Sequence, residues 1–409
     1  MYHAWVNRFL ALCLVTATLA VSRLAAAQFR ADSLTVIHAG RMLDGRGGRV
    51  DDVWITVRGG RIDGVSTRSV SLPGAIRIDL RGATVLPGLI DGHTHPGWYV
   101  DAQGKRNTPR NGDSPEAAAL ARAGNLFATL SAGFTTIQSI GGPEDFDLRN
   151  AVATGALPGP RVLTSGAPIN NPRLPVDSLR MLVRSLKAQG ADLVKLFASA
   201  GLGAGGAQTM SDEQIAAVCG EAKAQGLRSL VHAISAGSVR AATMAGCTQI
   251  EHGIFATDAE LKLMADRGTI FDPQVCLVFQ NYIDHPGAYN FTDSTLAPLK
   301  AALPTASDMF ARAIKIRGLK IVFGTDAVAL AHGRNADELL CRVKAGQEPM
   351  AAIRSATSAA ADAIGLGDRI GTLKAGYDAD LIAVDGDPSR DMGAITRVTF
   401  VMRAGVRVR

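Results

Sequence analysis

Short apolar runs alternate with longer amphipathic stretches through the middle of the chain. The runs predict buried β-strands, because they are short and turn residues bound them. Eight such runs are found, at residues 84–90, 135–139, 161–164, 193–197, 229–231, 248–251, 269–271 and 320–324. Helical spacing lies between them, at residues 114–131, 178–189, 211–225, 236–245 and 258–267. Strands alternating with helices predict an α/β fold, a (β/α)8 TIM barrel over residues 87–368.

Both ends of the chain have a different pattern of apolar and polar residues from the middle. Residues 28–81 alternate apolar and polar positions over short runs, which glycine-rich turns divide, and residues 379–408 repeat this pattern. Such alternation is typical of antiparallel strands with one solvated face. The sequence therefore predicts a small β-sandwich domain formed by both termini, residues 28–86 and 369–409.

The first 27 residues have the features of a signal peptide. A basic start precedes an apolar segment at residues 9–22, and Ala25-Ala26-Ala27 fits an A-x-A cleavage site. The apolar segment is short for a membrane span, which needs about 20 residues. We therefore expect an exported protein, periplasmic or secreted, with no membrane span in its mature form.

Charge and cysteine content indicate which partners to expect and whether the cysteines form disulfide bonds. The net charge of +6 is spread along the chain without a run of lysines or arginines, so no nucleic-acid partner is expected. One disulfide bond would be compatible with export. Isolated cysteines within apolar segments favour buried thiols instead, and these are Cys219, Cys247, Cys276 and Cys341. We expect a homo-oligomer that acts on a small molecule or dipeptide.

Potential metal ligands stand where the predicted strands end. His93 and His95 follow the first strand, His232 the fifth, His252 the sixth and Asp326 the eighth. Side chains two residues apart on a strand point to the same face, so the first two histidines can hold one ion. Each histidine alone is compatible with a buried core residue. Together they supply the imidazole and carboxylate ligands that suit zinc.

Lys195 lies inside the apolar run of the fourth strand. A buried charged amine is costly unless it is paired or its pKa falls. A neutral amine can add carbon dioxide and become a carbamate, which would bridge two metal ions. The alternative is a lysine whose ammonium group reaches the rim of the barrel.

These motifs together resemble the amidohydrolase superfamily, in its branch of imidazolonepropionase-like proteins and metal-dependent prolidases (Xaa-Pro dipeptidases). The resemblance covers nearly all of the chain after the leader and rests on Pro-Gly-Leu-Ile-Asp-Gly-His-Thr-His, Val-Lys-Leu-Phe-Ala-Ser, Val-His-Ala, Ile-Glu-His-Gly and Phe-Gly-Thr-Asp-Ala. It implies a (β/α)8 barrel with a small β-sandwich and two divalent ions, expected to be Zn²⁺. The ligands it implies are His93, His95 and Asp326 for the first ion, His232 and His252 for the second, and Lys195 as a bridging N6-carboxylysine.

The expected reaction is hydrolysis of a linear amide, in a dipeptide with C-terminal proline or in an N-acyl amino acid. Two metal ions about 3.5–4 Å apart would activate a hydroxide at neutral pH. Asp326 would be the catalytic residue that carries its proton to the leaving nitrogen. The alternative is a one-metal hydrolase of a cyclic amide or amidine, against which Lys195 argues. A non-catalytic binding protein is a third possibility, although all six ligand positions are filled.

Several further residues are candidates for contact with substrate or for support of the metal ligands. His332, after the last strand, is expected either to help hold substrate or to have no role. Residues 272–299 are expected to form a long loop, as a lid or substrate wall or as a solvated surface segment. Gln138-Ser139 stands where relatives often have an Arg-Asp pair. Glu251 is a candidate to orient a ligand imidazole, or else points into the barrel wall.

Overall fold

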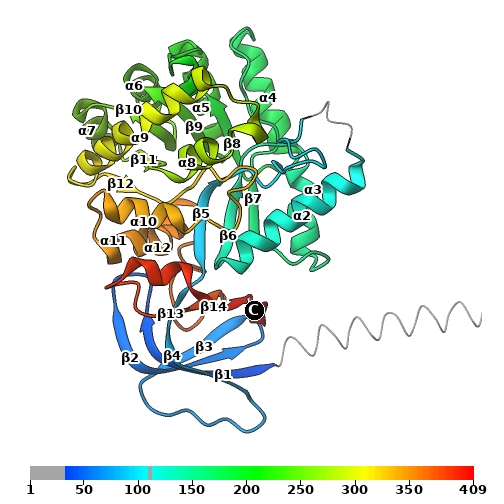
Figure 1. The fold of residues 1–409 in the computed structure, drawn as a ribbon, viewed down its shortest axis with the longest axis vertical. Coiled ribbons are helices and arrows are strands. Elements are labelled where there is room, and N and C mark those ends of the chain that lie inside the picture. Colours follow the sequence, from blue (N-terminus) through cyan, green and yellow to red (C-terminus); the bar gives the residue numbers. More distant parts are fainter. Residues whose placement is uncertain (1–32, 109–112) are drawn as a thin grey trace, which may run out of the picture.

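The computed structural model describes residues 33–108 and 113–409 (Figure 1). The signal peptide expected at residues 1–27 lies outside this part of the chain. A sheet built from both ends of the described chain lies next to a larger α/β part (Figure 1). Within residues 33–108 and 113–409, no helix combines the length and apolar character needed to cross a bilayer.

Strands from both chain ends share one seven-stranded sheet in the order β15-β14-β13-β4-β1-β2-β3. Its members are β1 (Leu34–Leu43), β2 (Arg49–Arg58), β3 (Arg61–Ser66), β4 (Ile76–Pro87), β13 (Leu381–Asp385), β14 (Val398–Arg403) and β15 (Val406–Arg407). β1 and β4 are parallel, and the other pairs are antiparallel. Alternate side chains such as Ile37, Val53, Ile55 and Leu381 form its own buried core.

The α/β part is built on parallel strands in two sheets, one of three strands and one of five. The strands are β5 (Leu89–Thr94), β6 (Phe134–Ser139), β7 (Arg161–Thr164), β8 (Leu193–Phe197), β9 (Arg228–Ser235), β10 (Gln249–Phe255), β11 (Ile270–Asp272) and β12 (Lys320–Ile321). Isolated parallel bridges, Ile169 with Leu196 and Thr94 with Ala327, connect the two sheets at both ends. This part is therefore TIM-barrel-like.

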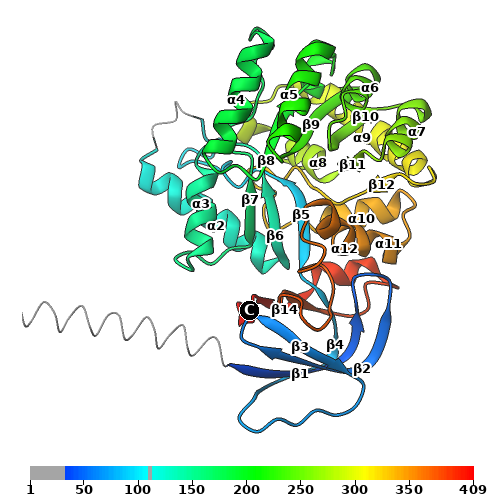
Figure 2. The ribbon, with the colours of Figure 1, turned by 180° about the vertical axis from the view of Figure 1, so that it is seen from behind.

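Helices surround these strands, and Figure 2 shows α4 to α7 outside β8 to β10. They are α2 (Pro115–Ser131), α3 (Asp145–Ala153), α4 (Val176–Ala188), α5 (Asp212–Ala224), α6 (Ala236–Met244), α7 (Asp258–Arg267), α8 (Leu277–Asp284), α9 (Asp293–Ala313), α10 (Asp337–Lys344), α11 (Pro349–Ser355) and α12 (Ser358–Ala363). Short 3₁₀ turns are η1 (Leu202–Ala204), η2 (Pro286–Tyr289) and η3 (Met392–Thr396). The side chain of Ser114 accepts a hydrogen bond from the Ala117 amide and so caps α2.

The run predicted as one strand at residues 84–90 is two strands. β4 pairs with β1 and β13, whereas β5 pairs with β6. Gly88 lies between them, and its amide donates to the carbonyl of Asp380 at 2.9 Å. One apolar run thus passes from the seven-stranded sheet into the α/β part.

The long loop expected at residues 272–299 was also a wrong prediction. This segment contains α8, η2 and the start of α9. Tyr289, Leu296 and Leu299 from it are buried against Ile234 and Ile254 of the central strands. Packing on the ends of the strands, rather than helix periodicity alone, explains why it is helical.

The expectation of four buried thiols was wrong as well. Cys219 on α5 is bonded to Cys247, just before β10, and Cys276 before α8 is bonded to Cys341 on α10. The partners lie 28 and 65 residues apart in sequence. Because each pair meets only through the packing of separate elements, the spacing of the cysteines carried no sign of the pairing.

Candidate metal centre

The six residues expected to bind metal come from five strands, whose C-terminal ends lie at the same place. His93 lies on β5, Lys195 on β8, His232 on β9 and His252 on β10. His95 follows β5, and Asp326 follows β12. In TIM-barrel folds the C-terminal ends of the strands carry the active residues.

Their side chains form one connected cluster. The Asp326 Oδ1 atom lies 3.0 Å from His95 Nε2 and 3.3 Å from His93 Nε2, and Lys195 Nζ lies 3.5 Å from His93 Nε2. The ring centroids of His93 and His252 are 5.1 Å apart. The structure thus brings the predicted residues together, and donor atoms of His93, His252 and Asp326 lie within 4.8 Å of one another. His232 completes the set, with its ring 4.5 Å from that of His252.

Two of these residues have strained backbones. His252 has a φ of 69° and Asp326 a φ of 54°. Left-handed backbone is uncommon for residues other than glycine and costs on the order of 1–3 kcal/mol. Such strain persists where the surrounding structure fixes the side chain, as at functional sites.

The electrostatics favour an uncharged nitrogen at Lys195 and at three of the four histidines, His95, His232 and His252. Burial and the charge of Lys195 also act to lower the pKa of His93, but the carboxylates of Asp326 and Glu251 outweigh them, and its net shift is upward. Lys195 is 1% exposed, and burial lowers its pKa although the carboxylates of Glu251, Asp326 and Asp272 oppose this. Burial and the neighbouring Lys195 lower the pKa of His232 to about 3. Neutral imidazole is the form that binds a metal ion. The donors therefore fit a site for divalent cations.

Glu251 lies directly behind His93. Its Oε2 atom is 2.6 Å from His93 Nδ1, and Gln249 Nε2 donates to its other oxygen at 2.9 Å. A carboxylate in this position fixes the tautomer and the ring orientation of a ligand histidine. Glu251 is therefore placed to orient His93 rather than turned away into the wall.

Asp91 is a supporting residue that sequence reasoning missed. Its carboxylate accepts hydrogen bonds from the Thr325 hydroxyl at 2.6 Å and the Asn335 amide at 2.7 Å. It also accepts from the backbone amides of His93 and Thr325. Burial raises the pKa of Asp91 to about 6, against these hydrogen bonds. Asp91 thus ties the strand of His93 to the loop of Asp326; its signal was its place two residues before His93.

A second set of buried ionisable side chains was also missed. Arg342 on α10 is fully buried, with Asp272 at 3.5 Å and Glu338 at 3.5 Å. Its Nη1 atom donates to the carbonyl of Val322 at 2.7 Å. Arg342 and Glu338 lie on a helix rich in charged residues, so the sequence held no sign that these two face the core.

His332 lies behind His95 and does not line the cavity beside the cluster. Its Nε2 atom is 3.2 Å from the carbonyl oxygen of His95. Burial lowers the pKa of His332 to about 4, which keeps the ring neutral. The position of His332 therefore supports a role in holding the backbone of His95, not a direct contact with a molecule in the cavity.

A cavity of about 220 Å³ opens beside His232, His252 and Asp326. The segment expected to be a loop forms one wall of it through α8 and the start of α9. Another wall is the glycine-rich turn around η1. The lining residues that carry side chains other than the three named are Leu202, Ile234, Ile254, Val278, Phe279, Tyr282, Phe291, Thr295 and Leu299.

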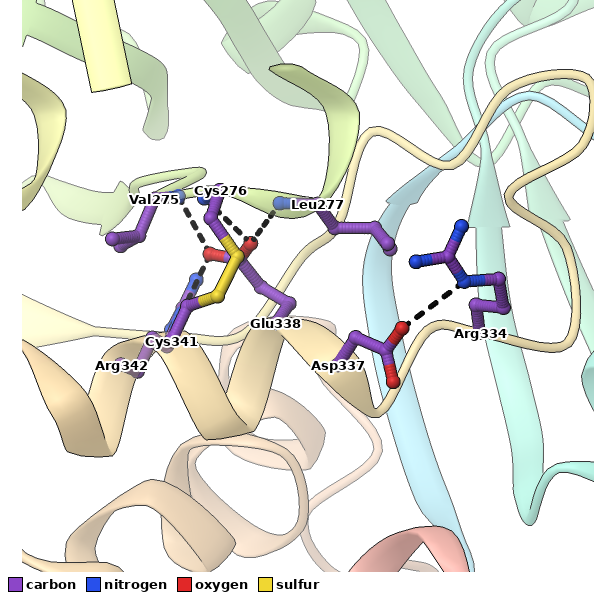
Figure 3. The surroundings of a disulfide bond; sticks show 8 residues. All are labelled: Val275, Cys276, Leu277, Arg334, Asp337, Glu338, Cys341 and Arg342. Atoms are coloured by element: carbon purple, nitrogen blue, oxygen red, sulfur yellow. Dashed lines mark hydrogen bonds and ion pairs between the residues drawn. A yellow bond between two sulfur atoms is a disulfide. The ribbon is translucent and has the colours of Figure 1, made fainter. Parts of the chain in front are cut away.

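Helix α8 is anchored at its N-terminus, as Figure 3 shows. The carboxylate of Glu338 accepts hydrogen bonds from the amides of Val275, Cys276 and Leu277 at 2.6, 3.0 and 2.9 Å. The Cys276–Cys341 disulfide joins the same two segments (Figure 3). The first amides of a helix lack partners within it, and an acidic group satisfies them well.

Comparisons with known proteins agree with this architecture. The chain is 27% identical over 375 residues to ochratoxinase of Aspergillus niger, covering 80% of this chain and 75% of that protein. It is 28% identical over 384 residues to imidazolonepropionase of Sphingopyxis alaskensis, covering 84% and 89%. The structure of a Xaa-Pro dipeptidase with bound methionine in its active site has a TM-score of 0.83 at 29% identity and covers 92% of this chain and 100% of that one.

The sequence profile of the amidohydrolase family matches residues 84–408, which is most of the chain. The match spans every strand and loop that carries the clustered residues. The protein therefore belongs to the amidohydrolase family and is a hydrolase that acts on carbon–nitrogen bonds.

Proposed function

We propose that the protein is an exported hydrolase of linear amides that uses two divalent metal ions, with Zn²⁺ as the expected metal. The observation that carries this proposal is the buried Lys195 within a cluster of four histidines and one aspartate. A site for one ion needs three or four ligands. Six convergent donors are enough for two.

The roles of the residues follow from their positions. His93, His95 and Asp326 would hold one ion, and His232 and His252 the other. Lys195, in its uncharged form, would become the carboxylated bridge. The two ions, when bound, would supply a water with lowered pKa and would polarise the scissile carbonyl.

Asp326 would move the proton in the reaction. Its carboxylate oxygen already lies between the imidazoles of His93 and His95, and its side chain borders the cavity where substrate would bind. It can thus accept a proton at that oxygen and deliver it to the leaving nitrogen. His332 would help to hold substrate indirectly, by fixing the backbone of the ligand His95.

The relatives support a linear amide as the substrate. A Xaa-Pro dipeptidase and a prolidase complexed with N-methylphosphonate-L-proline are among the similar structures, with TM-scores of 0.83 and 0.82. We propose a dipeptide with C-terminal proline or an N-acyl amino acid. Similarity to imidazolonepropionase favours the second candidate, a one-metal hydrolase of a cyclic amide.

We also propose a closed (β/α)8 barrel with a small β-sandwich, and export to the periplasm or medium. Two disulfide bonds support an oxidising compartment. Sequencing of the mature N-terminus from that fraction would test the cleavage after Ala27. Assembly as a homo-oligomer stays a prediction.

The proposal is tested by metal content and hydrolysis together. The purified protein should bind about two ions, and it should cleave members of a panel of Xaa-Pro dipeptides and N-acyl amino acids. Lys195→Met should lose one ion and most of the activity, whereas the matched change at the exposed Lys187 should change neither. One bound ion with activity on cyclic amides would favour the second candidate, and one ion with no amide hydrolysis would refute the proposal.

A further inference from the structure

The cavity beside the metal cluster has its imidazole and carboxylate groups on one side, and the hydroxyls of Tyr282 and Thr295 are the other polar side-chain groups among the described lining residues. His232, His252 and Asp326 line that side, and aliphatic and aromatic side chains line most of the rest. Among the described lining residues there is no lysine or arginine, and Asp326 is the only carboxylate. A charged group placed against the apolar walls would therefore lose its hydration without gaining a partner.

We infer that this cavity receives an uncharged apolar group, aliphatic or aromatic, attached next to the scissile amide. The inference rests on the proposed function and adds the chemical class of one half of the substrate. Cavities of about 150 Å³ with apolar walls bind benzene. The volume of about 220 Å³ therefore suits an aromatic ring or a chain of several methylenes.

The apolar wall is formed before substrate binds. Tyr282 packs edge-on against Tyr289, with ring centroids 4.6 Å apart. The side-chain amide of Asn281 donates to the carbonyl of Ala329 at 3.0 Å, and the Tyr289 hydroxyl donates to the same oxygen. Ala329 is three residues after Asp326, so the wall is tied to the loop that carries this carboxylate. A preformed pocket avoids the cost of ordering these side chains on binding.

Gly203 is an exposed lining residue at which a side chain can be added without removing a wall. It lines the cavity on η1, and a Cβ atom placed on it would have no heavy atom within 4 Å. Gly203→Phe therefore adds an aromatic ring at the rim of the cavity without disturbing the core. Gly124→Phe is the matched control, because Gly124 is exposed on α2 and is equally free of neighbours.

The test is calorimetric binding of straight-chain hydroxamic acids, from two to six carbons, to the zinc-loaded protein. The affinity should rise about fourfold for each added methylene, the factor expected for burial of one such group. Gly203→Phe should weaken binding of the six-carbon compound at least tenfold and should change that of the two-carbon compound less than threefold. Gly124→Phe should leave both unchanged.

Equal affinity along the series, no binding of the six-carbon compound, or equal effects of the two glycine variants would overturn the inference. Its failure differs from failure of the proposed function. Affinity that rises with chain length, without hydrolysis of any linear amide, would refute the function and leave the apolar pocket standing. Hydrolysis of amides at rates independent of the acyl chain and of the amine side chain would refute the inference about the cavity and leave the proposed function standing.

Discussion

Glu338→Gln should loosen the cavity wall, because this one carboxylate anchors the start of α8. Its oxygens accept three backbone hydrogen bonds, from Val275, Cys276 and Leu277 (Figure 3). Gln has one acceptor oxygen, and its NH₂ group would face amides that also donate. Two of the three amides share one oxygen, so either orientation of the new side chain leaves at least one amide without a partner.

The cost can be estimated from these contacts. A hydrogen bond to a charged acceptor contributes about 1.5–3 kcal/mol, and Arg342, fully buried beside Glu338, loses a charge partner as well. We expect a loss of about 3 kcal/mol in the free energy of unfolding. With an unfolding entropy of about 2.1 cal/mol/K per residue, this corresponds to a fall in Tm of roughly 4 °C in a chain of this length.

The neighbouring Asp337 gives a matched control. It lies on the same helix and pairs with Arg334 at 3.1 Å, but both side chains are partly exposed (Figure 3). Exposed ion pairs contribute about 0–1 kcal/mol, so Asp337→Asn should hardly change Tm. Calorimetry at fixed metal content measures both variants, and KM for the best amide should rise more than kcat falls in Glu338→Gln. Equal Tm values for the two variants would refute the anchoring role.

Other predictions concern the reaction, the disulfide and the pH dependence. Asp326→Asn should keep its metal, measured by elemental analysis, and lose turnover by about 10²- to 10⁴-fold; activity within about tenfold of the unmodified enzyme would remove it from proton transfer. The double Cys276→Ser/Cys341→Ser variant opens a loop with a sequence separation of 65 and should lose about 4 kcal/mol in denaturant unfolding; stability equal to that of the oxidised protein would contradict this. Burial raises the pKa of Asp145 from 3.8 to about 6, so the folded protein holds this proton more tightly than the unfolded chain. Its contribution to stability is full below about pH 4 and falls by about 3 kcal/mol as the pH rises through 6, and Asp145→Asn should lack this slope in unfolding curves; identical slopes would show that Asp145 does not titrate in this way.

Most of the α/β part could be predicted because its signals are local. Short buried strands between amphipathic helices have a distinct period, and the strand predictions at Arg161–Thr164 and Leu193–Phe197 match the observed bounds. The clustered residues were recognisable for the same reason. All of them except Lys195, which lies inside its strand, were predicted at the end of a strand, and parallel strands of such a fold place their C-terminal ends together.

The features that escaped prediction depend on contacts between distant segments. Helix α8 forms because its apolar side chains pack on the strand ends and because Glu338, 61 residues from Leu277, caps it. The disulfide pairs likewise meet only after the elements have packed. No periodicity within residues 272–299 encodes the contacts with Glu338 and the strand ends, so the sequence predicted a loop there.

The buried carboxylates behind the cluster explain how His93 keeps its orientation. Glu251 and Asp272 are neighbours in register on β10 and β11, and two adjacent buried carboxylates cannot easily both be ionised. Burial and the charge of Glu251 raise the pKa of Asp272. Burial also acts to raise the pKa of Glu251, but the charge and hydrogen bond of His93 outweigh it, and the net shift is downward. Asp272 therefore carries the proton while Glu251 stays anionic, accepts from His93 Nδ1 and leaves Nε2 directed at Asp326.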